Sequence, residues 1–199
     1  MGEMIYNLTQ DTQYKNYVEI GTWNGEGSTQ CFKDGLIQRE DNWRFFSFEF
    51  NPSFHQQAKR FHQEVLDDRF QLIYGCVVDV RDIMDAETLT LEAKLLGKDD
   101  GQIRTLQEWR KNEIRFCGKC ENKIHLLDDV DIDVLLLDGG ELTTKGEFLI
   151  LKPRSKIIIL DDTKEMKTNT IHAELLNDVE WECCVSSDHR NGFSIHKRK

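Results

Sequence analysis

The chain has 199 residues, with 26 lysines and arginines against 36 aspartates and glutamates, so its formal net charge is −10. This length is typical of one domain of about 100–200 residues, and the acidic balance argues against nonspecific binding of nucleic acid, which needs Lys and Arg to neutralise phosphates. No apolar run approaches the roughly 18–20 residues that span a bilayer. The first residues lack the pattern of a signal peptide, so we expect a cytoplasmic protein with mostly reduced cysteines.

Apolar runs alternate with helical patterns along the chain, which predicts an α/β fold with a doubly wound, mostly parallel sheet covered on both faces. The loop 186–191 is too short for a parallel crossover, so the last two strands form a C-terminal antiparallel hairpin. The predicted strands are 17–20, 44–49, 70–75, 132–138, 156–161, 181–185 and 192–196. The predicted helices are about 29–37, one that begins at Pro52, 144–151 and about 169–177.

The helix that begins at Pro52 and the region 80–129 lead to two further predictions. The helix that begins at Pro52 has apolar residues at helical spacing, which predicts a buried face made of Phe54, Ala58, Phe61, Val65 and Leu66. Residues 80–129 do not follow the alternation, although their leucines suggest helical stretches. We interpret 80–129 as an insertion within a single domain that spans 1–199.

Acidic residues follow the predicted strands where each strand ends. Ligands of an open parallel sheet bind beyond the carboxyl ends of its strands. A purely structural protein would gain nothing from the mutual repulsion of carboxylates at one edge, so we expect a ligand site there. The residues concerned are Glu19, Glu49, Asp79, Asp138, Glu141, Asp161 and Asp162.

The loop after the first strand contains glycines at 21, 25 and 27. Glycine lets a backbone turn sharply and approach a ligand closely. The spacing G-x-x-x-G-x-G differs from the dinucleotide pattern G-x-G-x-x-G, which weakens a nicotinamide interpretation. Glu49, at the end of the second strand, could accept hydrogen bonds from both ribose hydroxyls of a nucleoside. An ordinary strand-to-helix turn is the alternative.

With these residues in place, the sequence YVEIGTWNGEGST (17–29) resembles the first motif of class I S-adenosylmethionine-dependent methyltransferases, in the E-x-G-x-x-x-G form found among O-methyltransferases. LLLDGGE (135–141) and IIILDDT (157–163) resemble motifs of the metal-dependent branch, which includes the macrocin-type sugar O-methyltransferases. The hairpin also matches the Rossmann-like seven-stranded sheet of that family. The resemblance covers 17–79 and 130–196 and leaves 80–129 unexplained.

The resemblance implies S-adenosyl-L-methionine as the cofactor. Glu19 and Gly21 would line its methionine end, and Glu49 would bind its ribose. Asp79, or the backbone near Cys76, would meet its adenine. The full set expected around the cofactor is Glu19, Gly21, Thr22, Gly25, Ser28, Glu49, Asp79 and Asp138.

The same resemblance implies a metal site. Asp138, Asp161 and Asp162 would be ligands of a divalent cation such as Mg²⁺, which prefers carboxylate oxygens. For the Asp161–Asp162 pair, a helix N-cap is the alternative.

The proton acceptor needs a different residue from that of the macrocin-type branch. That branch carries D-G-D, and Gly140 stands here in place of its second aspartate. The candidates for proton transfer are Asp138, Glu141, Asp188 and His189. A solvated loop histidine is the alternative for His189.

Cys117 and Cys120 form a C-x-x-C pair that could hold half of a zinc site. The chain has no second C-x-x-C, so His125 and His172 would have to complete the site from elsewhere. A turn with two free thiols is the alternative.

The sequence therefore predicts transfer of a methyl group from S-adenosyl-L-methionine to a hydroxyl of a small molecule or saccharide, with Mg²⁺ as an assisting ion. Two alternatives stay open: an NAD-dependent oxidoreductase, and a non-catalytic cofactor-binding regulatory protein, which Gly140 keeps in view. We expect no nucleic-acid or membrane partner, and a homodimer stays open.

Overall fold

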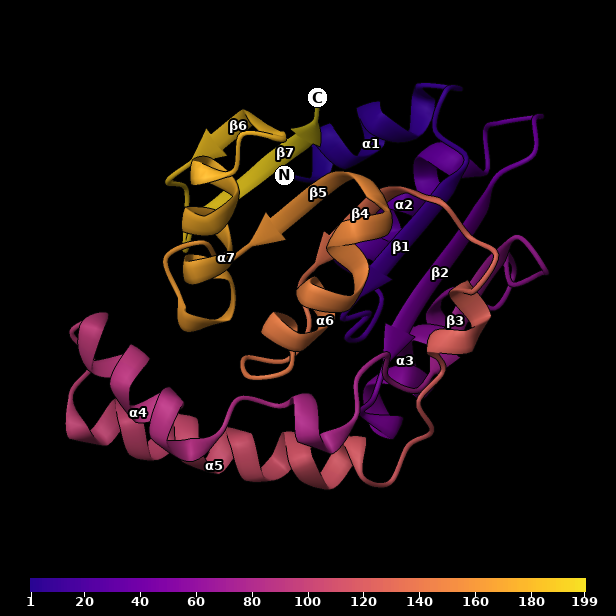
Figure 1. The fold of residues 1–199 in the computed structure, drawn as a ribbon. Coiled ribbons are helices and arrows are strands. Elements are labelled where there is room, and N and C mark those ends of the chain that lie inside the picture. The colour runs from indigo at the N-terminus through magenta and orange to yellow at the C-terminus, as the bar shows by residue number, and fades with distance from the viewer.

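The fold is built on a seven-stranded sheet of order β3-β2-β1-β4-β5-β7-β6, in a computed structural model that describes residues 1–199 (Figure 1). Strands β1 to β5 are parallel, whereas β7 runs antiparallel to both β5 and β6. The strands are β1 Asn16–Ile20, β2 Arg44–Glu49, β3 Phe70–Tyr74, β4 Ile132–Leu137, β5 Ser155–Asp161, β6 Trp181–Ser187 and β7 Phe193–Arg198. The predicted Rossmann-like, doubly wound α/β fold with its C-terminal hairpin is confirmed.

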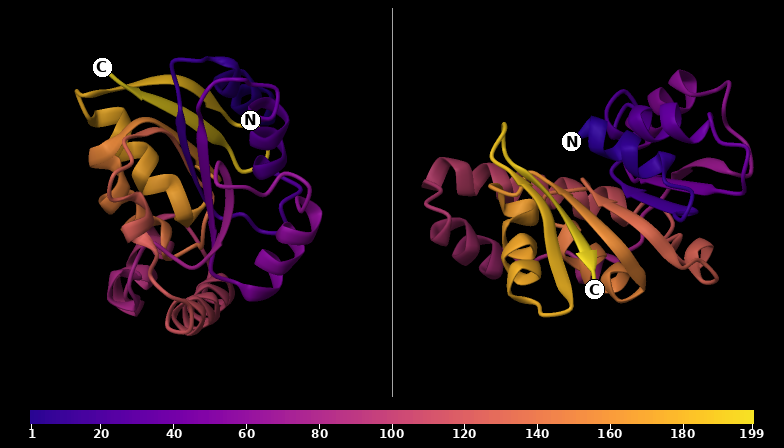
Figure 2. Two further views of the ribbon diagram at one scale, coloured as in Figure 1. Left: turned by 90° about the vertical axis from the view of Figure 1, so that its right-hand side faces the viewer. Right: turned by 90° about the horizontal axis from the view of Figure 1, so that it is seen from above.

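Helices cover both faces of the sheet (Figure 2). Helices α1, α2 and α3 lie on one face, and α6 and α7 lie on the other. The helices are α1 Gly2–Gln10, α2 Ser28–Leu36, α3 Pro52–Phe61, α4 Ala86–Leu95, α5 Asp100–Cys117, α6 Thr144–Leu151 and α7 Met166–Asn177. Three short 3₁₀ turns are η1 Val80–Asp82, η2 Ile124–Leu127 and η3 Lys152–Arg154.

Alternating side chains of the central strands enter two separate cores, because successive residues of a strand point to opposite faces. Leu135 of β4 packs in the core that contains Phe148 of α6. Its neighbour Leu136 packs in the opposite core with Phe32 of α2. Both faces of β4 are therefore buried, which explains why its sequence reads as one continuous apolar run.

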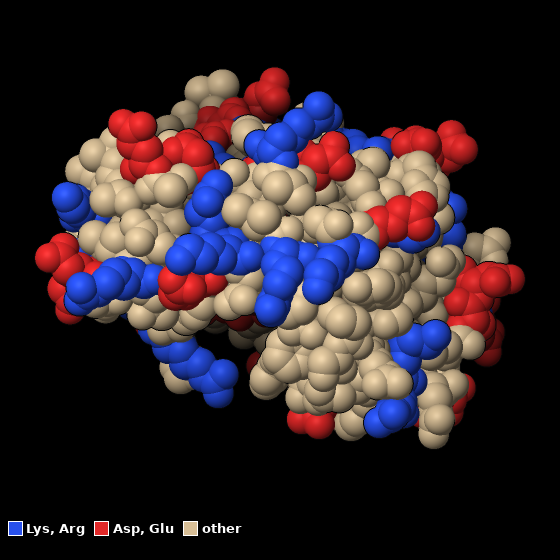
Figure 3. Space-filling model, turned by 90° about the horizontal axis from the view of Figure 1, so that it is seen from below, with Lys and Arg blue, Asp and Glu red and all other residues tan.

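The region 80–129 contains the helix pair α4 and α5, which lies across the end of the sheet toward which the parallel strands point (Figure 1). Its apolar residues, such as Leu89 and Leu106, pack in a third core with Leu142 and Met166 from the sheet side. Seen from the side of α4 and α5, lysines and arginines form a band across the surface, so the negative net charge is unevenly spread (Figure 3).

Three details differ from expectation. Helix α1 was not predicted, although its amphipathic residues contribute Ile5 to a core. The predicted apolar face of α3 is wrong at Phe61, which is 45% exposed. The reason is that α3 lies against the outer strands and ends at Phe61, so Ala58 is its only buried residue. Helix α7 begins at Met166 after an N-cap at Glu165, so the N-cap alternative for Asp161–Asp162 is wrong.

No helix combines the length and the apolar character that crossing a membrane requires.

Candidate active site

A cavity of about 420 Å³ opens where the parallel strands end. Its wall is formed by residues that follow β1, β2, β3, β4 and β5, so the predicted edge of the sheet is the place where a concave site forms. The lining residues include Gly21, Trp23, Glu49, Phe54, Gly75, Cys76, Asp138, Gly139, Glu147, Asp161 and Asp162.

Gly21 allows the first and fourth strands to approach each other at the cavity. Its φ is +97°, a value that side chains rarely tolerate, and a Cβ there would lie 2.2 Å from the carbonyl oxygen of Asp138. The amide of Asp138 also donates to the carbonyl of Ile20 at 2.9 Å. Only glycine fits this position, so the wall can be formed by bare backbone beside the Asp138 carboxylate.

Glu49 ends β2 with its carboxylate on the cavity wall. Its oxygens accept hydrogen bonds from the amides of Trp23 at 2.8 Å and of Asn51 at 2.7 Å. Burial raises the pKa of Glu49 to about 7, although these amide bonds act in the opposite direction. Each carboxylate oxygen has a further lone pair, so Glu49 can still accept hydrogen bonds from a ligand.

Glu19 lies behind the glycine loop and does not line the cavity. Its side chain is fully buried and accepts hydrogen bonds from Ser28 at 2.5 Å, Thr29 at 2.6 Å and Ser47 at 2.6 Å. Burial raises the pKa of Glu19 to about 7, and the three hydroxyls oppose that rise. Glu19 therefore ties the start of α2 to β1 and β2.

Thr22, Gly25 and Asp79 also lie off the wall. Thr22 hydrogen-bonds Ser47, with 2.5 Å between the two hydroxyl oxygens, and the carbonyl of Gly25 contacts the His62 ring at 2.8 Å. Asp79 accepts a hydrogen bond from Asn122 at 3.0 Å and caps η1. After β3, the wall is formed by Gly75 and Cys76.

The three aspartates expected to bind metal do come together. Each of Asp138, Asp161 and Asp162 offers an oxygen, and these oxygens lie within 4.8 Å of one another. The sequence did not indicate that Lys167 would join them: its Nζ lies 2.6 Å from Asp138 and 2.8 Å from Asp162. Burial lowers the pKa of Lys167, but the two carboxylates outweigh burial and hold that pKa above its usual value.

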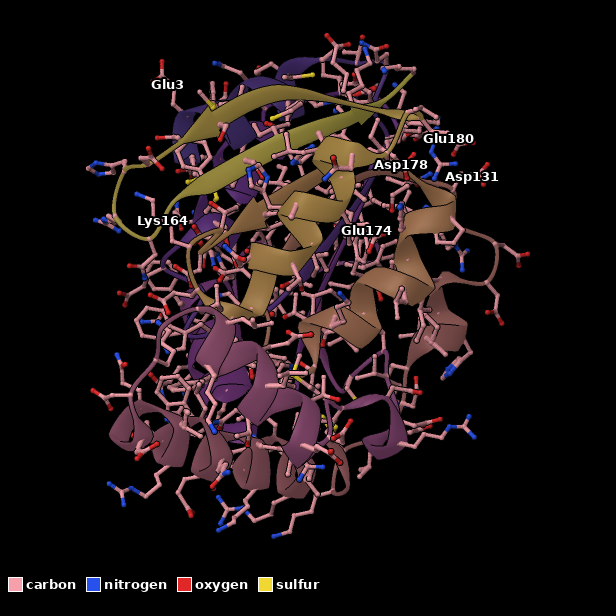
Figure 4. The ribbon with its side chains drawn as sticks, turned by 60° about the vertical axis from the view of Figure 1, so that its left-hand side comes forward. Glu3, Asp131, Lys164, Glu174, Asp178 and Glu180 are labelled. Carbon is pink, nitrogen blue, oxygen red and sulfur yellow. The ribbon has the colours of Figure 1, made fainter.

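The residues proposed for proton transfer are less well placed, apart from Asp138. Glu141 does not line the cavity, and its carboxylate accepts a hydrogen bond from the amide of Lys167 at 3.2 Å. His189 is exposed in the β6–β7 loop. Asp188 in the same loop forms an ion pair of 3.1 Å with Lys164. Figure 4 shows Lys164 at the surface beside that loop.

Glu147 of α6 is a wall residue that the sequence did not single out. It is 1% exposed, and its Oε2 has no hydrogen-bond partner. Burial raises the pKa of Glu147 to about 8; the charge of Glu113 adds to the rise, and the hydroxyls of Thr143 and Thr144 oppose it. The sequence signal that could have identified Glu147 is a glutamate within the otherwise apolar run 146–151. Burying an unpaired carboxylate costs free energy, so such a residue is a candidate for a functional role.

The C-x-x-C pair meets a third thiol instead of histidines. Cys120 Sγ lies 3.5 Å from Cys76 Sγ, which belongs to the cavity wall. His172 contacts His196 instead, with 3.0 Å between ring nitrogens. The aspartate cluster is the only group of three or more side chains spaced to hold a metal, so the zinc interpretation has no supporting geometry.

The fold of this chain is similar to the folds of several solved methyltransferase structures. No family model matches the sequence, and the search of curated proteins found no match. A Staphylococcus aureus protein assigned as a caffeoyl-CoA O-methyltransferase is 16% identical, with a TM-score of 0.63, over 100% of this chain and 82% of that protein. A Bacillus cereus O-methyltransferase in complex with SAH is 14% identical, with a TM-score of 0.61, over 100% and 80%. A SAH-bound Podospora anserina methyltransferase is 14% identical, with a TM-score of 0.60, over 100% and 77%. The chain therefore has a Rossmann-like methyltransferase fold.

Proposed function

We propose that this protein is an S-adenosyl-L-methionine-dependent methyltransferase that acts on a hydroxyl of a small molecule or saccharide. The observation that carries the proposal is the position of the Glu49 carboxylate at the end of β2, on the same cavity wall as Gly21 and Asp138. The SAH-bound neighbours of the same fold support the choice of cofactor.

The cofactor would follow the strand ends across this cavity. Glu49 would accept hydrogen bonds from the ribose hydroxyls, and the backbone at Gly75 and Cys76 would border the adenine. The bare backbone at Gly21 would face the methionine end. Trp23 and Phe54, whose rings lie edge to face at 6.0 Å, belong to the same wall and would exclude water from one side of the bound cofactor.

Bound cofactor supplies the electrophilic methyl group, and the chain supplies position and proton transfer. Holding an acceptor oxygen in line with that methyl group accounts for much of the rate enhancement in such reactions. We assign the proton acceptor to Glu147, because it lines the cavity and has a free Oε2. Burial raises its pKa to about 8, so the carboxylate form, which can accept a proton, becomes populated as pH rises above neutral.

The aspartate cluster as it stands does not fit a divalent cation. The ammonium of Lys167 already lies between Asp138 and Asp162, at the distances of direct ion pairs. A hard cation such as Mg²⁺ needs close to six oxygen ligands at about 2.1 Å, so it would have to displace this side chain. No step of the proposed reaction therefore depends on a metal.

The strand order disfavours the oxidoreductase alternative. A dinucleotide-binding sheet has the order 3-2-1-4-5-6, whereas the antiparallel β7 lies between β5 and β6 in this chain.

The non-catalytic alternative predicts cofactor binding without methyl transfer to any acceptor in a broad screen with labelled cofactor.

Calorimetric titration with S-adenosyl-L-methionine tests the cofactor site. Glu49→Ala should weaken binding by at least about 10–100-fold, because the loss of even one hydrogen bond to a charged group costs roughly 1.5–3 kcal/mol. Glu64→Ala is the matched control, since Glu64 is an exposed glutamate whose ion pair with Lys33 spans 3.9 Å. A thermal melt without ligand establishes that each variant is folded. Unchanged affinity in folded Glu49→Ala would refute the assignment.

A further inference from the structure

We propose that the ammonium of Lys167 takes the place of a divalent cation among Asp138, Asp161 and Asp162, so that the site excludes Mg²⁺ and works with an internal positive charge. This inference deepens the proposed function and rests on it for the identity of the site. It concerns a residue of α7 that the sequence motifs do not include.

The ammonium bridges two of the three carboxylates of the cluster. Its Nζ lies 2.6 Å from Oδ1 of Asp138, at the end of β4, and 2.8 Å from Oδ2 of Asp162, just beyond β5. The side chain of Lys167 is 7% exposed, whereas those of Asp138 and Asp162 are 27% and 28% exposed. The ammonium therefore contacts the two carboxylates on their buried side, where water has least access to a cation that both carboxylates bind.

Backbone and side-chain contacts direct Lys167 into the cluster. The amide of Lys167 donates to Glu141 Oε1 at 3.2 Å, and the hydroxyl of the next residue, Thr168, donates to the carbonyl of Asp161 at 2.6 Å. These two bonds fix the first turn of α7 against the ends of β4 and β5. Lys167 therefore extends from a fixed helix and not from a loop.

The backbone and side-chain contacts of Asp162 also orient its carboxylate toward Lys167. Its φ of +57° is uncommon for a residue with a side chain. Its Oδ1 accepts a hydrogen bond from Asn191 at 3.0 Å, and its Oδ2 faces Lys167. Both oxygens of Asp162 are therefore engaged by side chains of this protein.

Several oxygens of the cluster are already engaged by the protein. Oδ1 of Asp161 accepts a hydrogen bond from the amide of Asp162 at 3.0 Å, so it could offer a cation only its second lone pair. A divalent ion among these oxygens would also lie next to a positive charge in a poorly hydrated site, where like charges repel strongly. Metal and ammonium are therefore alternatives.

Lys167 is then a positioning residue that acts through Asp138. Asp138 lines the cavity and Lys167 does not, so the ammonium would reach bound ligand only through the carboxylate. In a methyltransferase of this architecture, the ion pair keeps Asp138 oriented at the wall without any ion from solution.

Cation titration of the full-length protein tests the inference directly. Mn²⁺ binding followed by electron paramagnetic resonance, and Mg²⁺ binding followed by calorimetry, should show no site with a dissociation constant below roughly 1 mM in the wild type. The melting temperature should be the same with chelator and with Mg²⁺. A wild-type site of that affinity that Asp161→Asn weakens about tenfold or more would overturn the proposal.

Removal of the ammonium should create the missing site. Lys167→Ala is expected to bind Mn²⁺ at least about tenfold more tightly than the wild type and to melt at a higher temperature when Mn²⁺ is added. Lys164→Ala, at an exposed lysine of the neighbouring loop, is the matched control and should gain nothing (Figure 4). A folded Lys167→Ala without a gain in affinity contradicts the proposal. Should this variant fail to fold, the wild-type titration decides.

The cation titrations need neither cofactor nor acceptor, so they are independent of the proposed function. Cofactor binding to the wild type without a cation site supports both proposals. A cation site together with cofactor binding overturns only the role of Lys167. Failure to bind cofactor overturns the function and leaves the exclusion of metal standing as a property of the cluster.

Discussion

Gly140 has a packing reason that the sequence does not reveal. A Cβ at this position would lie 2.7 Å from Glu113 Oε2 and 2.8 Å from Thr143 Oγ1. Glu113 cannot easily move away, because the same Oε2 accepts hydrogen bonds from the amides of Leu142 at 3.0 Å and Thr143 at 3.1 Å. The aspartate expected in the D-G-D pattern would place a second carboxylate against Glu113, so packing against α5 accounts for a glycine at this position.

Gly140→Ala should therefore lower the free energy of unfolding by about 1–3 kcal/mol, as overpacked sites do, and Gly140→Asp should cost more because it adds charge repulsion. Urea unfolding measures both effects. Gly101→Ala is the control, since this glycine lies in α5 and its only close neighbour is the Asp99 carboxylate at 3.1 Å. A Gly140→Ala protein within about 0.5 kcal/mol of the wild type would show that the site tolerates a side chain.

At the scale of elements, α5 of the region 80–129 helps to build the turn into α6. Glu113 is 6% exposed on the inner side of α5, and burial raises its pKa to about 7. Glu113→Ala would leave two buried amides without a partner, so we expect the free energy of unfolding to fall by about 1–3 kcal/mol. Glu113→Gln keeps an accepting oxygen and should lose less.

Amide hydrogen exchange locates this effect. In Glu113→Ala, the amides of Leu142 and Thr143 should exchange faster than in the wild type. Glu108→Ala, on the exposed side of the same helix, removes only a surface pair with Lys111 and should change neither exchange nor stability measurably. Equal exchange at 142–143 in both variants would mean that α5 does not support the turn.

These contacts show where prediction from sequence ends. The strands were predictable because each carries a local apolar run, and strand-end residues such as Glu49 and Asp138 followed from the rule that parallel strands end at one edge. Lys167 and Glu113 were not predictable, since each meets partners 26 to 30 residues away through the packing of a helix whose rotation no short pattern fixes. The resemblance to the methyltransferase motif implied that Glu19 lines the cofactor site, whereas its side chain is fully buried and lies off the cavity wall.

At the scale of the whole molecule, buried carboxylates whose pKa values are raised lie both on the cavity wall and behind it. Burial raises the pKa of Glu147 to about 8, that of Glu19, Glu49 and Glu113 to about 7, and that of Asp138 to about 6. An unfolded glutamate titrates near about 4.3. Between these values the folded protein holds protons that the unfolded chain has released, so the free energy of unfolding falls as pH rises.

From about pH 6.5 to about pH 8.5 ordinary carboxylates are ionised. Histidines whose pKa is lowered by burial, such as His62, act in the opposite direction at the lower end of this window, because the unfolded chain still binds protons on imidazoles with a pKa of about 6.5. The decline in stability that the buried carboxylates cause should therefore be clearest in the upper half of the window, from about pH 7.5 to about pH 8.5, in urea unfolding. Glu147→Gln removes one titrating proton and should flatten the decline by up to about 1.4 kcal/mol per pH unit. Glu174→Gln, at a surface position of α7 paired with Lys152, should leave the slope unchanged (Figure 4). Since Glu147 is also the assigned proton acceptor, an unaltered slope in Glu147→Gln would remove the basis for that assignment, whereas a flattened slope would establish that Glu147 titrates in this window and becomes the proton-accepting carboxylate as pH rises through it.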